Sequence, residues 1–270
     1  MTDRSVDKAL MQKAHYKTDE KLVLRKKYNQ FAIPKANIHQ DIIKKIFALK
    51  PTKILDVGCG NGDFLIELRE KGFTGEITGL DISKGIQEKG REQNKKEKLN
   101  IEFIVGDAEN LPFKDNSFDV ITAKHMLYHL PNPQKGTDEM FRCLKKRGVA
   151  IITLNSKNNT PMLHECEHRI CKKYKLATEH GQDLVNMETA EKFLHKFTNI
   201  EKFYKEGKIS KPKMFPAIFE SFRDNYDPQP SDALWKIIMN DVKTFVKEKI
   251  AANGEFVETR ISGAIIAQKN

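Results

Sequence analysis

The sequence predicts an α/β fold in which a doubly wound, mostly parallel sheet is covered by helices on both faces. The first observation is periodicity: beyond Pro51, short apolar runs alternate with segments whose apolar residues recur at helical spacing. The second is a glycine turn, Gly58–Gly62, between the first apolar run and the helical pattern that follows it. The third is size, because 270 residues with 39% hydrophobic side chains can bury a large core.

The N-terminal region is expected to be a helical cap over residues 1–36. Its helical pattern breaks at Ala32-Ile33-Pro34, since proline and the residue before it do not continue a helix. A second helix is expected over 38–49, where isoleucines recur on one face until Pro51 ends the pattern.

Strands and helices are then expected in alternation. Apolar, β-branched runs predict strands at 54–57, 76–80, 101–105, 118–123 and 149–154. Helical spacing predicts helices at 64–68, from Ser83 to the charged stretch 95–98, and at 135–146. Strands that alternate with helices favour parallel pairing, with both faces of the sheet covered.

The pattern loosens after residue 154. Helices are expected at 161–175 and 188–196, and a sixth strand at 200–204. Two more helices are expected at 216–224 and 231–250, before a final strand at 256–267 that Gly263 interrupts. The stretch 210–254 therefore lies between the last two strands, and we expect it to form a helical lid.

The composition of the chain indicates which kinds of binding partner and which cellular compartment to expect. The net charge is 47 − 37 = +10, but 38 Lys against 9 Arg favours a solvated surface over the arginine forks that read nucleic acids. Four cysteines are too few for a disulfide scaffold, and no apolar run is long enough to span a membrane. The stretch Met1–Ser5 has no apolar signal region. We expect a cytoplasmic protein, monomeric or homodimeric, for which nucleic acid is not the partner.

The glycine turn is suited to a ligand that touches the backbone. Gly58, Gly60 and Gly62 follow a strand and open a helix, whose first N–H groups attract polar or anionic groups. A dinucleotide fingerprint would have its third glycine at position 63, where Asp63 stands instead. A carboxylate there would repel a pyrophosphate, so the spacing argues against a nicotinamide dinucleotide.

Acidic residues end the next two predicted strands. Asp81 can accept two hydrogen bonds from ribose hydroxyls. Asp107 and Ala108 suit the exocyclic amine and the face of adenine, and Ile82 can pack on the other side of that ring. Because open α/β sheets bind ligands at the carboxyl ends of their strands, these positions predict a nucleoside site.

Four segments, in order and in spacing, resemble the motifs of class I S-adenosylmethionine-dependent methyltransferases. They are Ile54–Gly62, Gly79–Ser83, Gly106–Phe113 with Ser117–Val120, and His125–Leu130. The resemblance extends from Lys53 to Leu154. It implies S-adenosyl-L-methionine as cofactor and a Rossmann-like, mixed sheet of seven strands. The methyltransferase domain would then cover 37–270, with the lid insert at about 210–254.

The resemblance also implies individual roles. Gly58 and Gly60 would border the methionine part of the cofactor, and Asp56 would lie near its amino group. The remaining cofactor contacts would come from Asp81 at the ribose, Ile82, Asp107 and Ala108 at adenine, the Lys124 carbonyl at the methionine amine, and Tyr28 or Arg25 at the carboxylate.

The reaction expected is methyl transfer to an oxygen or nitrogen of a small molecule. A sulfonium donor is already activated, so alignment and exclusion of water supply much of the acceleration. If the acceptor must lose a proton, His129 is the first candidate base and His125 the second, because the histidine pKa lies near 6.5. Either could instead be a helix-start histidine that bonds local backbone. The pocket wall would include Tyr128 and the lid side chains Phe215, Phe219, Phe222 and Trp235, for which ordinary helix core is the alternative.

Two other functions stay open. A tRNA or other RNA methyltransferase would explain the charge, although the fourth strand ends in Ala123–Met126 and not in an Asn/Asp-Pro-Pro-aromatic motif. A non-catalytic member could bind the cofactor as a sensor or partner subunit. Finally, His164–His168 matches H-E-x-x-H, but a zinc hydrolase would need a third ligand and its own scaffold, so we expect no metal.

Overall fold

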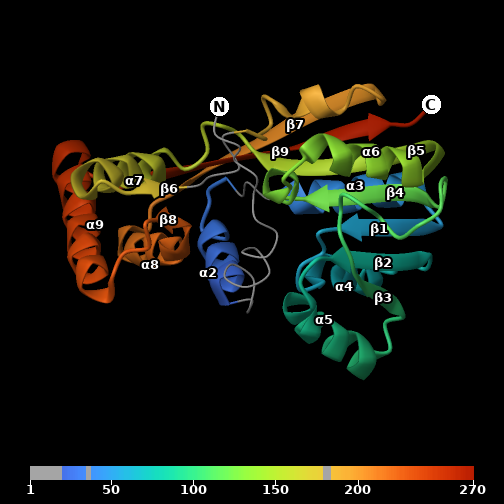
Figure 1. The fold of residues 1–270 in the computed structure, drawn as a ribbon, viewed down its shortest axis with the longest axis horizontal. Helices are drawn as coiled ribbons and strands as arrows, with labels where there is room; N and C mark the ends of the chain where they lie inside the picture. Colours follow the sequence, from blue (N-terminus) through green and yellow to red (C-terminus); the bar gives the residue numbers. More distant parts are fainter. Residues whose placement is uncertain (1–19, 35–37, 179–183) are drawn as a thin grey trace.

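The computed structural model describes residues 20–34, 38–178 and 184–270. Its main feature is a seven-stranded sheet in the order β3-β2-β1-β4-β5-β9-β7 (Figure 1). The strands are β1 (Lys53–Val57), β2 (Glu76–Asp81), β3 (Ile101–Val105), β4 (Phe118–Lys124), β5 (Leu144–Asn155), β7 (Thr198–Ile209) and β9 (Glu258–Gln268). Pairing is parallel from β3 to β5, whereas β9 runs antiparallel to β5 and β7. The predicted doubly wound, mixed seven-stranded sheet is confirmed.

Helices cover both faces because the strands are apolar on both. On one face, α3 (Ile38–Leu49) and α4 (Asp63–Glu70) share a core with Ile54, Ile77 and Val120. On the other, α6 (Pro133–Cys143) packs over Leu55 and its neighbours. The helix α5 (Lys84–Glu97) lies against β3, and Ser83 caps it by accepting from the Ile86 N–H. Successive side chains of a strand point to opposite faces of the sheet, so each strand contributes to both cores.

Several local expectations are wrong. The predicted helix 188–196 is only a 3-10 turn, η4 (Ala190–Phe193), whose last carbonyl accepts from Thr137 Oγ1 on α6 at 2.6 Å. Gly263 does not interrupt the last strand: it pairs with Leu154 and Tyr204, and an added Cβ would meet the Met187 side chain. The stretch 144–146 belongs to β5 and not to the preceding helix.

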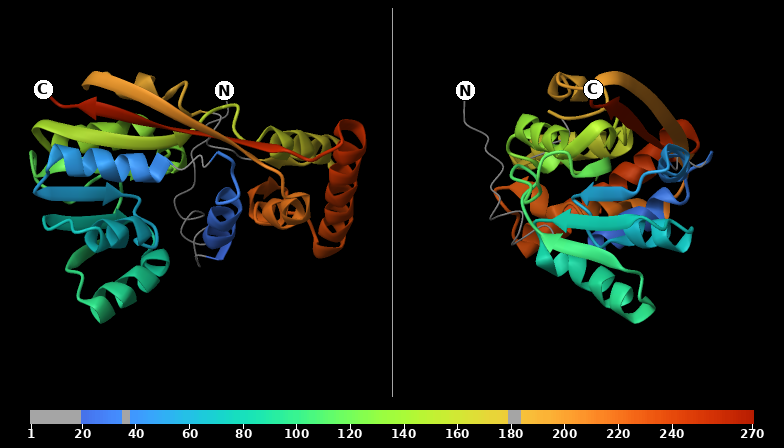
Figure 2. Two further views of the ribbon diagram at one scale, coloured as in Figure 1. Left: turned by 180° about the vertical axis from the view of Figure 1, so that it is seen from behind. Right: turned by 90° about the vertical axis from the view of Figure 1, so that its right-hand side faces the viewer.

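The helices of the expected lid have a hydrophobic core of their own. They are α7 (Pro161–Tyr174), α8 (Phe215–Glu220) and α9 (Asp232–Asn253). Strands β6 (Ala177–Thr178) and β8 (Tyr226–Asp227) form a two-stranded ribbon beside them. The expected insert of 210–254 holds α8 and α9, and the packing adds α7. Figures 1 and 2 show β7 and β9 running from the main sheet to these helices.

The helix α2 (Glu20–Asn29) lies between the sheet and the lid (Figure 1). Its Tyr28 packs in a small cluster with Ile209 of β7 and Ile218 of α8. Beyond it, Ile33 pairs with Lys208 as an isolated bridge. Residues 1–19 of the expected N-terminal cap lie outside the described residues. The part of the cap that is described therefore borders both the sheet and the lid.

Truncating a side chain in the lid core should unfold the lid at lower denaturant. Phe219 is fully buried and stacks on Trp235 with ring centroids 6.1 Å apart. We expect Phe219→Ala to destabilise the lid by about 3–5 kcal/mol, because it leaves a cavity. Trp235 is the one tryptophan of the chain, so its fluorescence during urea unfolding reports on the lid.

The control is Ile237→Ala on α9, where the side chain is 53% exposed. It should leave the urea midpoint nearly unchanged. Equal midpoints for wild type and Phe219→Ala would contradict a lid core built on this stack.

Candidate active site

The carboxyl ends of β1, β2, β3 and β4 meet at one edge of the sheet, on the side that faces α2 (Figure 1). Parallel pairing forces this, because all four strands end in the same direction. The predicted cofactor residues that follow or end these strands are therefore brought to one edge. The site is built from the turns after each strand.

The turn after β1 has the left-handed backbone that its glycines allow. Gly58, Gly60 and Gly62 have φ values of 71°, 56° and 77°. A Cβ on Gly58 would lie 2.8 Å from the Met126 Cβ, and one on Gly62 would lie 2.6 Å from the Phe103 ring. On Gly60 the nearest heavy atom to such a Cβ would be 3.9 Å away, so the protein leaves room beside the middle glycine.

Asp81 ties this turn to the end of β2. Its Oδ2 accepts from the Gly60 N–H and its Oδ1 from the Ser83 N–H, each at 2.9 Å. Burial raises the pKa of the Asp81 carboxyl, and the backbone donors oppose that shift. Ile82 adds a third backbone donor, and a carboxylate has about four lone-pair positions, so Asp81 keeps acceptor capacity for a further donor. The half-buried Asp81 can therefore accept ligand hydroxyls without losing its bonds to the turn.

Asp56 is a buried carboxyl inside the sheet. The Thr122 hydroxyl donates to its Oδ1 at 2.5 Å, across the pair that joins β1 and β4. Burial raises the pKa of Asp56 to about 6, and the nearby Lys124 ammonium opposes the shift. The ammonium of Lys124 lies over the Phe64 ring, 3.6 Å from its centroid. This edge thus holds carboxyl and ammonium groups side by side.

The turn after β3 is organised by Asp107. Its Oδ1 accepts from the Glu109 N–H at 2.9 Å, and the residue bridges to Asn110. Ala108 is buried, while Ile82 after β2 is half-buried. An acidic side chain and two apolar side chains therefore end two neighbouring strands. Their geometry is compatible with the expected adenine contacts, which stay a prediction.

The two candidate bases differ in environment. His125 directly follows β4 with φ 51°, and its N–H donates to the Thr153 carbonyl. Burial, together with Arg260 and Lys124, lowers the pKa of His125 to about 3, so this ring is neutral near pH 7. His129 ends the 3-10 turn η2 (Leu127–His129) and is half-buried, with its ring 4.4 Å from that of Tyr128. The expected helix start at 125–130 is thus a single 3-10 turn.

Sequence reasoning missed Arg260 on β9. This half-buried guanidinium interacts electrostatically with Glu258, Tyr28, Tyr128 and Arg25. Tyr28, which the resemblance assigns to the cofactor carboxylate, interacts electrostatically with this arginine. A signal was present, because charged residues recur at alternate positions in the first half of an otherwise apolar strand.

The lid aromatics are core and not pocket wall. Phe215, Phe219 and Trp235 are buried against one another and against α7. The Trp235 indole N–H donates to Glu220 Oε2 at 2.7 Å. The expectation that they line the acceptor pocket is wrong, since the amphipathic lid helices use them to hold the lid together. Phe222 differs, because the Arg25 guanidinium lies over its ring at 5.0 Å.

The glutamate of the H-E-x-x-H motif on α7 is engaged in ion pairs. Glu165 binds Arg169 at 2.8 Å and Lys249 at 2.5 Å. Among the residues that the structure describes, no three His, Cys, Asp or Glu side chains stand together as a metal site. Within the same residues, no helix is both long and apolar enough to cross a membrane.

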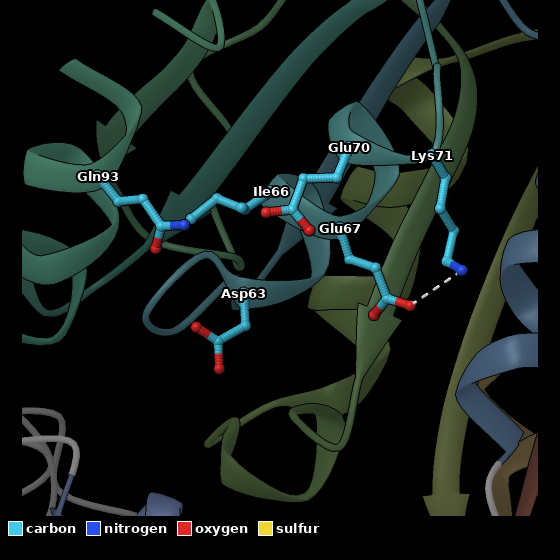
Figure 3. A pocket seen from close by; sticks show the side chains of 6 residues that line it. All are labelled: Asp63, Ile66, Glu67, Glu70, Lys71 and Gln93. Atoms are coloured by element: carbon cyan, nitrogen blue, oxygen red, sulfur yellow. Dashed lines mark ion pairs between the residues drawn. The ribbon is translucent and has the colours of Figure 1, made fainter. Parts of the chain in front are cut away.

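An open hollow of about 460 Å³ lies between α4 and α5 (Figure 3). Its lining is Asp63, Ile66, Glu67, Glu70, Lys71 and Gln93. Glu67 pairs with Lys71 at 3.7 Å, and it also binds His39 at 2.6 Å. None of the predicted cofactor positions lines this hollow. It is a charged surface feature outside the predicted site.

The sheet order and the glycine and aspartate turns define the class I fold of S-adenosylmethionine-dependent methyltransferases. Residues 48–210, more than half of the chain, match the methyltransferase domain family. The chain belongs to that family.

Among curated relatives, the demethylmenaquinone methyltransferase of Staphylococcus saprophyticus is 36% identical over 126 residues. That stretch covers 46% of this chain and 54% of the relative, so the chain spans about half the length of the curated relatives it matches. The similarity includes a small-molecule methyltransferase, but only over the part that is shared.

Solved structures share the fold at low identity. The YcgJ protein of Bacillus subtilis has a TM-score of 0.61 at 19% identity, covering 86% of this chain and 97% of its own. A phosphoethanolamine N-methyltransferase of Haemonchus contortus, in complex with phosphomonomethylethanolamine and S-adenosylhomocysteine, has a TM-score of 0.58 at 18% identity. That match covers 100% of this chain and 60% of the other. At such identities the likeness shows the fold alone.

A methyl group added at Gly60 should obstruct ligand binding without clashing with protein atoms. Gly60→Ala and Gly72→Ala both place alanine at positive φ, and neither new Cβ would meet a protein atom closer than 3.9 Å. Each should cost about 1 kcal/mol of stability from backbone strain. We expect calorimetry to show at least about tenfold weaker adenosylhomocysteine binding for Gly60→Ala only. Equal affinities for both variants would contradict a ligand at Gly60.

The buried Asp56 carboxyl should make stability fall as pH rises. Its pKa is raised from 3.8 to about 6, so the folded state holds this proton more tightly than the unfolded chain does. The contribution is present below about pH 4 and lost by about pH 6. It amounts to about 3 kcal/mol at most, at roughly 1.4 kcal/mol per pKa unit.

Urea unfolding of wild type and Asp56→Asn at about pH 4.5 and about pH 7 measures this contribution. The wild type should lose more stability on raising the pH than the variant does. Asp115→Asn, at a 68% exposed side chain, should behave like wild type. The assignment would be wrong if the Asp56→Asn and wild-type pH dependences coincided.

Proposed function

We propose that this chain transfers a methyl group from S-adenosyl-L-methionine to an oxygen or nitrogen atom of a small molecule. The observation that carries the proposal is the Asp81 carboxylate, which binds the glycine turn and Ser83 while keeping lone pairs for a ligand. Family membership supports the same reaction class. The resemblance of the four motif segments supports the same cofactor.

The residues present suit this cofactor chemically. The open side of Gly60 admits a ligand against the backbone, and Asp81 offers acceptors to the two ribose hydroxyls. Asp107 would accept from the adenine amine, between Ala108 and Ile82. At the other end, Asp56 would attract the amino group of the methionine part, because its carboxyl is ionised above about pH 6. The bound cofactor supplies a sulfonium-activated methyl group.

The chain's own contribution is alignment and exclusion of water. The turn after β1 and the carbonyl of Lys124 would orient the donor. We assign proton removal to His129 and not to His125, because burial leaves His125 with a pKa of about 3 and thus a weak base. The lid and α2 would close over the acceptor, and α2 lies between the site edge and the lid helices (Figure 2).

Replacing Asp81 should weaken cofactor binding strongly. In Asp81→Asn, the amide presents donors where the carboxylate accepted both ribose and backbone hydrogen bonds. A charged hydrogen bond contributes about 1.5–3 kcal/mol, which predicts an adenosylhomocysteine affinity lower by about tenfold to a hundredfold. Isothermal calorimetry measures it, and Asp115→Asn serves as the exposed control with unchanged affinity.

Two outcomes would reject the proposal. One is wild-type protein that binds a nicotinamide dinucleotide but neither adenosylmethionine nor adenosylhomocysteine. The other is tight adenosylmethionine binding without transfer of labelled methyl to any member of a panel of small phenols, amines and carboxylic acids, with transfer to tRNA instead. The first would overturn the cofactor and the second the class of acceptor.

A further inference from the structure

The proposed reaction assigns no role to Arg260, a half-buried charged residue near the expected site. Arg260 lies on β9, where it pairs with Gly207 of β7. The neighbouring strand β5 already ends at Asn155, which pairs with Ser262. Arg260 therefore stands two residues, about 6–7 Å, beyond the end of β5, where Ser156 and Thr160 bond the carbonyls of Ile261 and Thr259 on either side of it.

The sheet order places this arginine away from the cofactor positions. Those positions end β3, β2, β1 and β4, whereas β9 lies two strands beyond β4. At about 4.8 Å per strand, β9 is roughly 14 Å from β1. The main electrostatic partners also differ, since Asp56 interacts with Lys124 and Asp81 while Arg260 interacts with Glu258, Tyr28, Tyr128 and Arg25. The two sets meet at His125, whose pKa both Arg260 and Lys124 lower. Along the sheet, Arg260 is therefore separated from the strands that carry the cofactor positions.

Among the described residues, the acid that interacts with Arg260 is already shared with backbone donors. Glu258 is the acid that interacts with Arg260, but its carboxylate already accepts from the N–H groups of Met162, Leu163 and Thr259. Arg25 adds a second guanidinium to the same surroundings. Because a guanidinium stays protonated and half-buried charges need partners, the local balance favours an anion.

The buried hydroxyl of Tyr28 is a second observation that points to a ligand here, independent of the charge balance at Arg260. Its side chain is 3% exposed, and its hydroxyl is buried with no hydrogen-bond partner among the described residues. An orphaned buried hydroxyl costs about 1–3 kcal/mol, and it interacts here with Glu258 and Arg260. A ligand oxygen at this point would accept from both the phenol and the guanidinium.

We propose that Arg260, Arg25 and the Tyr28 hydroxyl form an anion-recognition site that binds a carboxylate or phosphate group of the methyl acceptor. This rests on the proposed function, because it assigns the acceptor side of that same site. The edge of the sheet then has two halves: carboxyl groups at the cofactor half and guanidinium groups at the acceptor half. An anionic group held at Arg260 would orient the acceptor toward the donor.

The same anion site could instead hold the carboxylate of the cofactor, and the experiment separates the two sources. Wild type and Arg260→Gln are compared by calorimetry with adenosylhomocysteine and with 5′-methylthioadenosine, which lacks that carboxylate. Each protein, saturated with adenosylhomocysteine, is then titrated with benzoate, inorganic phosphate and the uncharged methyl benzoate.

For the acceptor assignment, saturated wild type should bind benzoate or phosphate more tightly than methyl benzoate. Arg260→Gln should weaken the anions by about tenfold or more, with adenosylhomocysteine affinity unchanged within about twofold. If Arg260→Gln instead weakens adenosylhomocysteine but not methylthioadenosine, the anion is the cofactor carboxylate and the proposal is overturned. Anion binding that Arg260→Gln leaves unchanged also overturns it.

A second variant keeps the test independent of folding at β9. Tyr28→Phe removes only the orphaned hydroxyl, and it should weaken the same anions several-fold without loss of stability. Tyr226→Phe is the matched control, because Tyr226 is also 3% exposed with a partnerless hydroxyl, but in the lid core. It should leave anion binding unchanged. If wild type binds no adenosylhomocysteine, the proposed function fails first, and that result is distinct from every outcome above.

Discussion

The candidate site depends on one carboxylate, that of Asp81, which joins two turns that end neighbouring strands. Its oxygens accept from Gly60 of the turn after β1 and from Ser83 at the start of α5. The Gly58 and Cys59 N–H groups bond the Leu80 carbonyl just before it. The conformation of the glycine turn and the position of the ligand-binding acid are therefore set together. Any ligand that uses Asp81 meets a turn whose backbone is already in place.

The lid helices pack around a hydrophobic core that is separate from the cores on the two faces of the sheet. Phe215, Phe219 and Trp235 bury one another between α7, α8 and α9, while the sheet packs under α3, α4 and α6. The long strands β7 and β9 link the two parts, so residues of β9 belong to the sheet at one end and reach the lid at the other. A residue such as Arg260 can therefore lie above the sheet edge and still be rigidly held by strand pairing.

Charge is distributed along the sheet edge in a way that suits two different ligands. The strands β1, β2 and the turn after β3 bring Asp56, Asp81 and Asp107 to one side, where a cationic and hydroxyl-rich molecule would bind. The last strand carries Arg260, which interacts electrostatically with Arg25 and Tyr28. Lys124 stands between these groups, close to both Asp56 and His125. The division follows from the strand order and not from any local motif.

The amino-acid sequence by itself determined the first five strands, the glycine turn and the acids that follow the strands. These depend on local information: apolar period, glycine at positive φ, and the direction shared by parallel strands. Residues 188–196 had a helical pattern, but α6 binds the backbone there through Thr137, and tertiary packing replaced the helix with a turn. Only the tertiary structure decided that α7 joins the lid core and that Tyr28 interacts electrostatically with Arg260. Residues more than two hundred positions apart are brought near each other by the pairing of β9 with β7 and by the packing of α2 on Ile209 of β7, and no local period encodes that proximity.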